Sequence, residues 1–195
     1  MSAREEIVRA LGGAVAPAAA PPILYTPAPA HDTDLFARFA ASLAAAGGTA
    51  RALDGASALA EALRADPHVA AARRLWSSLP ELAPRWPDGP PRAPHDFAQL
   101  DVALLRGELA VAESGAVWWA PRDVLERAAA FLAERVVLVA PRAGVVADLH
   151  AAYARLDVAA LPYGCFVCGP SKTADIEQAL VIGAHGPRAL EVWLV

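Results

Sequence analysis

The chain has 195 residues, 17 basic and 21 acidic side chains, a formal net charge of −4 and a hydrophobic share of 56%. This low charge and high apolar content excludes intrinsic disorder, and the absence of a basic stripe argues against nucleic acid as a partner. Alanine, arginine and proline largely replace lysine and asparagine, a bias typical of GC-rich coding. High hydrophobicity therefore does not by itself indicate a membrane protein.

The two cysteines, Cys165 and Cys168, are too few for a disulfide framework or for a complete zinc or iron–sulfur site. We therefore expect this chain to hold no metal and no cofactor of its own. The first residues carry Glu5 and Glu6 and lack the apolar run of a signal peptide. Residues 10–30 are uncharged, but their prolines would break any spanning helix. The expectation is a cytoplasmic protein without membrane insertion.

The predicted elements begin with a short helix, because Ser2 and Glu5 have the spacing of a capping box. This helix ends near Leu11. Residues 1–30 then form an N-terminal helix and an Ala/Pro-rich arm, with a short strand at 23–26. A single α/β domain is expected to fill residues 31–195.

The first part of that domain opens with a helix, capped by Asp32 or Thr33, whose apolar residues recur at helical spacing. The helix stops at Gly47. The patterns then predict a strand at 49–53, a helix at 57–65, either a strand at 69–72 or a helix that reaches Leu79, and a loop at 80–94.

The second part alternates strands and helices more sharply. Strands are predicted at 102–105, 109–112, 117–119, 136–139, 164–167 and 189–195. Helices are predicted at 123–133, 145–156 and 174–182. This alternation predicts an α/β fold with a mostly parallel sheet flanked by helices.

One candidate site joins the strand at 164–167 to the helix at 174–182. Its sequence is Gly169-Pro170-Ser171-Lys172-Thr173-Ala174-Asp175-Ile176-Glu177. Ser171 or Thr173 can cap the helix, and the free N–H groups at its start would bind an anion beside the Lys172 charge. Such a site would lie at the carboxyl end of a strand, where open α/β sheets bind ligands. The alternative is only a capped helix.

A second candidate is Glu113-Ser114-Gly115, which interrupts two apolar runs. An acid buried there would need a partner, and it could act as nucleophile, general base or substrate-orienting group. The alternative is a turn acid that faces solvent.

A third candidate is the turn from Gly183 to Arg188. His185 could serve as an acid/base group there, and Arg188 could hold a carboxylate. The alternative is a helix end at Gly183 followed by a structural turn. The pair Cys165 and Cys168 has redox spacing, but the flanking sequence reads as a strand, and the two residues would point to opposite or oblique sides.

These motifs resemble the LUD-domain family, and within it the C proteins of LutABC lactate-utilisation systems. The resemblance rests on three segments: Ala110–Gly115, Gly169–Glu177 and Gly183–Pro187. It implies a fold similar to the NagB/RpiA/CoA-transferase group. It also implies a role in oxidising L-lactate to pyruvate beside partner proteins that carry the iron–sulfur clusters. In related folds a glutamate acts on a carboxylate or acyl group, and Glu113 is the candidate by that analogy.

The function expected from this sequence is an accessory subunit of an iron–sulfur-dependent lactate-oxidation system that binds a small anionic ligand. The alternatives are a stand-alone acyl or CoA transferase or ligase that uses Glu113, and a non-catalytic scaffold or regulatory protein. Glu113 and His185 are the candidate catalytic residues. The candidate ligand-binding residues are Ser114, Gly115, Gly169, Pro170, Ser171, Lys172, Thr173, Asp175, Gly186 and Arg188.

Overall fold

The structure is a computed structural model that describes residues 2–12, 34–175 and 178–195. The chain divides into two units, Met1–Asp32 and Thr33–Val195. In the first unit, α1 (Ala3–Gly12) forms where it was predicted. Its capping box is present, since the Ser2 N–H donates to the Glu5 carboxylate and the Glu5 N–H donates to the Ser2 hydroxyl. The strand predicted at 23–26 lies outside the described residues.

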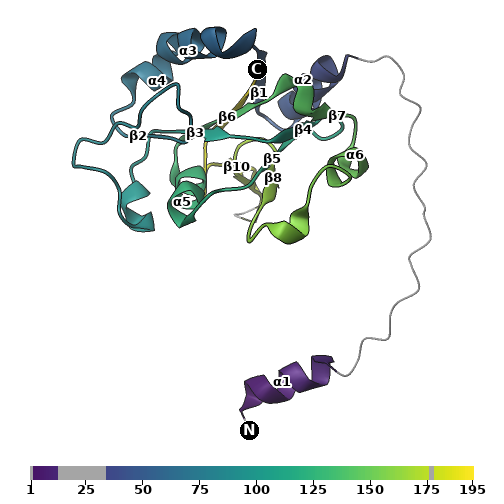
Figure 1. Ribbon diagram of the computed structural model, residues 1–195. Helices are drawn as coiled ribbons and strands as arrows, with labels where there is room; N and C mark the ends of the chain where they lie inside the picture. The colour runs from purple at the N-terminus through teal and green to yellow at the C-terminus, as the bar shows by residue number, and fades with distance from the viewer. Residues whose placement is uncertain (1, 13–33, 176–177) are drawn as a thin grey trace. The chain divides into compact units, whose positions relative to one another are not determined.

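The second unit is built on two sheets. The first sheet has five parallel strands in the order β1-β11-β6-β3-β2, which confirms the predicted α/β class with a mostly parallel sheet (Figure 1). Its strands are β1 (Thr49–Ala52), β2 (Leu75–Ser77), β3 (Val102–Arg106), β6 (Arg135–Ala140) and β11 (Ala189–Leu194).

The apolar run of β6 shows why this sheet is covered on both faces. Val136 and Leu138 pack into one core, whereas Val137 and Val139 pack into another on the opposite face. Successive side chains of a strand alternate in this way, so a continuous apolar run predicts a doubly covered strand. The second core is closed by α3 (Gly55–Ala65) and α4 (Pro67–Ala71), which lie together on one face of the sheet (Figure 1).

The second sheet packs on the other face. It has the order β7-β4-β5-β8, with β5 antiparallel to both of its neighbours. Its strands are β4 (Leu109–Val111), β5 (Ala116–Trp119), β7 (Val145–Val146) and β8 (Cys165–Val167). Its outer face is covered by the short helix α6 (Leu149–Tyr153). The helix predicted at 145–156 was therefore too long, because its first residues pair with β4 and the helix begins only after its cap, Asp148.

Two further helices complete the core between the sheets. They are α2 (Leu35–Ala45) and α5 (Val124–Leu132). The cap of α2 is Asp34, whose carboxylate accepts the N–H groups of Phe36 and Ala37. The predicted caps Asp32 and Thr33 lie outside the described residues. Asp123 caps α5 by accepting the N–H of Glu126.

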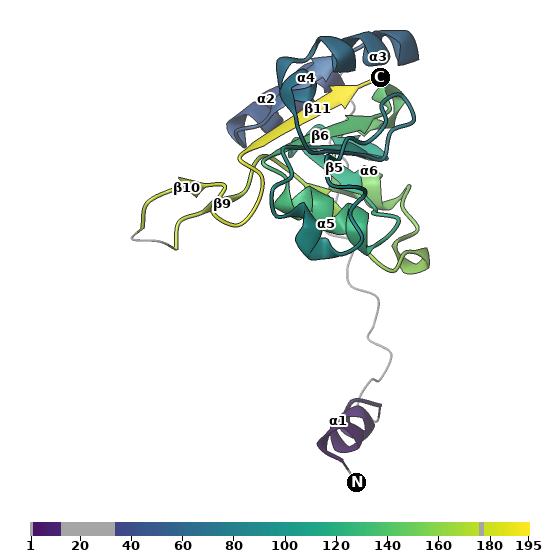
Figure 2. The same ribbon diagram turned by 90° about the vertical axis from the view of Figure 1, so that its left-hand side faces the viewer.

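Two other predictions were wrong. The helix reaching Leu79 is absent, because α4 ends at Ala71 and the chain continues as β2. The helix at 174–182 is also not formed by the described residues. Instead β9 (Lys172–Thr173) and β10 (Val181–Ile182) pair as an antiparallel hairpin, which extends away from the sheets (Figure 2). The 3-10 turns are η1 (Pro94–Phe97), η2 (Arg142–Gly144) and η3 (Val158–Ala160).

Candidate functional site

Two motif turns pack against the C-terminal end of α2. Gly115 and Gly169 both have a φ of +70°, a conformation that L side chains rarely adopt. A β-carbon on Gly115 would overlap the backbone of Leu43, and one on Gly169 would overlap the carbonyl oxygen of Ala46. Glycine is therefore required twice for the close approach of these turns to one helix end.

Hydrogen bonds connect the three motifs to one another. The Cys168 thiol donates to the carbonyl oxygen of Ser114 at 3.1 Å, which links the first motif to the second. The N–H of Ser171 donates to the carbonyl oxygen of Pro187 at 2.8 Å, and the N–H of Gly183 donates to that of Ser171 at 2.9 Å. The three segments singled out in the sequence thus form one continuous surface.

This surface borders a cavity of about 520 Å³ between the two sheets, which we call the inter-sheet cavity. It lies near the amino ends of β6 and β11. The turn at Gly169 follows the carboxyl end of a strand, as the sequence predicted, but that strand is β8 of the second sheet, which runs antiparallel to β5. The apolar lining residues are Leu105, Trp119, Ala130, Phe131, Val136, Leu138, Phe166, Val167 and Leu190.

The polar part of the lining comes mainly from the motif turns and includes Ser171, Lys172 and His185, together with both thiols and Tyr163. None of the Asp and Glu residues that the structure describes lines this cavity. Lys172 is exposed and lies beside Gly47, where a β-carbon would come within 3.2 Å of Nζ. Among the described residues Lys172 has no ion-pair partner, and the nearby C-terminal end of α2 favours a cation. The lining is therefore electropositive.

The thiols of the lining are held in the protonated form. Burial raises the pKa of Cys165, although a hydrogen bond with Tyr163 opposes the shift. Burial and this same hydrogen bond raise the pKa of the Tyr163 hydroxyl. Burial also raises the pKa of Cys168, and the positive charge of Lys172 opposes it. In the described part of the chain no three His, Cys, Asp or Glu side chains gather closely enough to hold a metal ion.

Six of the predicted site residues line the inter-sheet cavity: Gly169, Pro170, Ser171, Lys172, His185 and Gly186. The predicted residues that lie outside its lining are Glu113, Ser114, Gly115, Thr173, Asp175 and Arg188. Gly115 lies against Leu43 of α2, and the carbonyl oxygen of Ser114 accepts the thiol of Cys168, which lines the cavity.

Glu113 is exposed on the turn between β4 and β5, so it does not need the buried partner that its apolar flanks suggested. Its carboxylate accepts the N–H of Leu149 at 3.4 Å, and its carbonyl oxygen accepts the hydroxyl of Ser42 at 3.2 Å. His185 lines the cavity and Glu113 does not, so the described geometry does not bring the two candidate catalytic groups together in the inter-sheet cavity.

Thr173, Asp175 and Arg188 have local partners. The Thr173 hydroxyl donates to the Asp175 carboxylate at 3.2 Å and accepts the Asp175 N–H at 3.2 Å. Because β9 starts at Lys172, neither Thr173 nor Ser171 caps a helix, and the predicted anion site at a helix start is absent there. Arg188 forms an exposed ion pair with Glu134 at 3.6 Å.

Sequence reasoning missed the apolar walls of the cavity. Trp119 is fully buried in the core, and its position on the cavity lining follows from no local motif. Its neighbour Trp118 packs in the core under α6, because alternation along β5 sends the two side chains to opposite faces. Tyr163 and Phe131 had no local pattern to mark them, since they reach the cavity only through the packing of distant segments.

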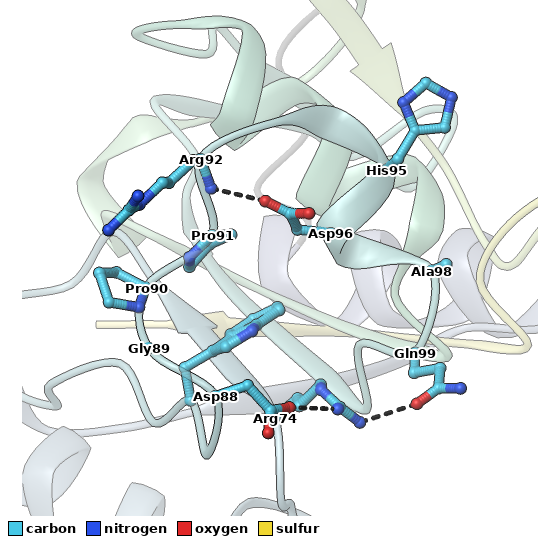
Figure 3. A pocket seen from close by; sticks show the side chains of 11 residues that line it. Arg74, Asp88, Gly89, Pro90, Pro91, Arg92, His95, Asp96, Ala98 and Gln99 are labelled. Atoms are coloured by element: carbon cyan, nitrogen blue, oxygen red, sulfur yellow. Dashed lines mark hydrogen bonds and ion pairs between the residues drawn. The ribbon is translucent and has the colours of Figure 1, made fainter.

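A second concavity, the loop hollow, lies in the Pro-rich region (Figure 3). It measures about 400 Å³. Arg74 donates to the Asp88 carboxylate at 2.7 Å and to the Gln99 side chain at 2.9 Å. The Asp96 carboxylate accepts the backbone N–H groups of Arg92 and Ala93, and these bonds lower its pKa. Arg74 and Asp96 thus hold the loop, whereas the Arg92 guanidinium on the same lining has no ion-pair partner among the described residues.

Comparison with known proteins identifies the family. The sequence profile of the LUD domain matches residues 38–195. The chain belongs to the LUD-domain family. This membership agrees with the three motifs from which the resemblance was inferred, and it covers nearly the whole second unit.

Among curated proteins, this LUD-domain chain is similar to lactate utilization protein C of Geobacillus thermodenitrificans, with 35% identity over 95 residues, or 46% of this chain and 40% of that protein. The protein of the same name from Bacillus subtilis is 31% identical over 96 residues, again 46% of this chain and 40% of its own length. The match thus spans about two fifths of the length of these relatives.

A solved structure supports the fold. A DUF162 family protein from Deinococcus radiodurans superposes with a TM-score of 0.56 at 20% sequence identity, and covers 83% of this chain and 96% of that one. At this identity the likeness concerns the α/β architecture alone. No helix in the described parts of the chain is long and apolar enough to cross a membrane.

Proposed function

We propose that this LUD-domain chain is an accessory subunit of an iron–sulfur-dependent system that oxidises L-lactate to pyruvate, and that it binds a small anionic ligand in the inter-sheet cavity. The names of the curated relatives support the lactate role. The iron–sulfur clusters are placed on partner proteins, because the two cysteines of this chain cannot complete a cluster site.

The observation that carries the ligand proposal is the position of Lys172. It borders a cavity that no described Asp or Glu lines, and it has no ion-pair partner among the described residues. An ammonium group in such surroundings attracts an anion, and the Ser171 hydroxyl on the same lining offers a further hydrogen bond. The position of Glu113 off this lining favours the accessory role over acyl transfer on that carboxylate.

Binding of anions to the purified chain tests the ligand proposal. Calorimetric titration with L-lactate, pyruvate and a nucleotide should detect binding of at least one, with affinity at least about tenfold lower in Lys172→Met. Arg188→Met is the matched control, because Arg188 is an exposed cation outside the cavity. The ligand proposal is wrong if no anion binds, or if both variants weaken binding equally.

The accessory role has its own test. An affinity-tagged chain expressed in its native host should co-purify with cysteine-rich proteins that show the visible absorption of iron–sulfur clusters. A chain that remains alone, and whose removal leaves growth on L-lactate unchanged, would contradict the role in lactate oxidation.

A further inference from the structure

The size of the inter-sheet cavity constrains what it binds. At about 520 Å³ it lies within the range of roughly 300–1,000 Å³ that is typical of sites for ligands much larger than lactate. A lactate-sized acid held at Lys172 would leave most of this space without ligand. We therefore expect a ligand whose acid group is attached to a larger body that fills the rest of the cavity.

The walls indicate the chemistry of that body. The accessible apolar lining comes from Phe131, Tyr163 and Val167, which are exposed or half-buried, whereas Leu105, Leu138 and Trp119 form the packed core beneath them. The Phe131 ring lies against the Trp119 ring in an edge arrangement, with centroids 6.4 Å apart. Walls of this kind favour an apolar ligand body, and aromatic side chains favour an aromatic ring with which they can pack edge to face.

The polar and apolar groups are also separated by depth. Lys172 and His185 are exposed, so they mark the solvent side of the lining, whereas Tyr163 and Val167 are half-buried against the core. A ligand that satisfies both ends must carry its charge outward and its apolar part inward. An acid with no apolar part would meet only the outer groups.

We infer that the inter-sheet cavity takes an aromatic carboxylate, with the acid group at Lys172 and Ser171 and the ring between the two sheets, rather than lactate itself. This inference rests on the proposal that the cavity binds an anion, and it specifies the class of that anion. A subunit of this kind would respond to a ligand distinct from the substrate that the system oxidises.

Three probes separate the contributions of ring and acid. L-3-Phenyllactate differs from L-lactate by one phenyl ring, and 2-phenylethanol keeps the ring without the acid. Calorimetric titration of the full chain should show phenyllactate binding at least tenfold more tightly than either of the other two. Equal affinity for lactate and phenyllactate would overturn the aromatic class, and equal affinity for phenylethanol and phenyllactate would overturn the role of the acid.

Two variants test whether the ring of phenyllactate lies in this cavity. Phe131→Ala should lower the affinity for phenyllactate several-fold, because Phe131 lines the cavity. Leu132→Ala is the matched control, since Leu132 is exposed to a similar extent on the same helix but does not line the cavity. Circular dichroism checks that both variants are folded.

The outcomes also distinguish this inference from the proposal on which it rests, namely that the inter-sheet cavity binds an anion. If lactate binds with Lys172 dependence and phenyllactate binds no better, only the aromatic class fails. If neither acid binds, and no other anion does, both the ligand proposal and this inference fail. If Phe131→Ala and Leu132→Ala have the same effect on phenyllactate affinity, the ring does not lie in the inter-sheet cavity and the inference is overturned.

Discussion

The loop hollow and the inter-sheet cavity are concavities of similar size, about 400 and 520 Å³, but they use their polar groups in opposite ways. In the loop hollow, Arg74 and Asp96 bond to neighbouring groups of the same loop region (Figure 3). In the inter-sheet cavity, Lys172 has no such ion-pair partner in the described part of the chain. Arg92 of the loop hollow also lacks an ion-pair partner among the described residues, so the difference lies in the carboxylates: Asp88 and Asp96 line the loop hollow, whereas no described Asp or Glu lines the inter-sheet cavity.

The largest expected effect compares a glycine from each region. Gly169 and Gly89 have φ angles of +70° and +87°, but a β-carbon on Gly89 would meet nothing within 4 Å. Gly89→Ala should therefore lower the free energy of unfolding by only about 1–2 kcal/mol, from the left-handed backbone. Gly169→Ala should lower the free energy of unfolding by about 1–3 kcal/mol more than Gly89→Ala, because its β-carbon overlaps Ala46. Urea unfolding measures both, and equal losses would show that the turn does not depend on its approach to α2.

The segment around Gly169 also shows which parts of the site the sequence could predict. The turn at Gly169 and the buried strands β3 and β6 follow from local patterns. The hairpin after the turn does not, because residues 174–182 favour a helix locally while the fold pairs Lys172 with Ile182. Tertiary pairing overrode the local preference there.

The cavity walls were harder still to predict. Leu138 and Trp119 lie on different sheets, and their meeting depends on how the sheets pack. A single sequence carries periodicity along each strand but no register between distant strands, so it could indicate the motif turns without the space that they border.

The second prediction removes one cation from each concavity and compares the effects on stability and on binding. Arg74→Met should lower the free energy of unfolding by about 1 kcal/mol, since Arg74 bonds to an exposed carboxylate and an amide. It should leave anion binding unchanged. Lys172→Met should instead weaken anion binding and keep the free energy of unfolding within about 0.5 kcal/mol of the wild type. Chemical unfolding and calorimetric titration of both variants test the comparison, which fails if Arg74→Met weakens binding as much as Lys172→Met.

The third prediction uses Cys168 as a reporter on the inter-sheet cavity. In a Cys165→Ser background, burial holds the pKa of the Cys168 thiol above its ordinary value of 9.0. A raised pKa means less thiolate at a given pH, so alkylation at pH 8 should be slower than for a free thiol and should rise as the pH passes above 9. A bound acid should slow it further. A rate that levels off below pH 9, or that ignores every ligand, would contradict the placement of this thiol on the cavity lining.

The smallest effect is expected from Asp96 in the loop hollow. Its folded-state pKa is lowered by the N–H groups of Arg92 and Ala93, so its contribution to stability is present above the unfolded-state pKa and is lost as pH falls through the folded-state value. Asp96→Asn should therefore lower the melting temperature slightly near neutral pH and leave it closer to wild type under strongly acidic conditions. Melting curves between these limits measure the difference, with Asp157→Asn as the control because Asp157 is exposed and its side chain makes no cap hydrogen bond. Because Asp96 is exposed and bonds only to its own loop, its loss should leave ligand binding in the inter-sheet cavity unchanged, and a loss of binding would show that the two concavities are coupled.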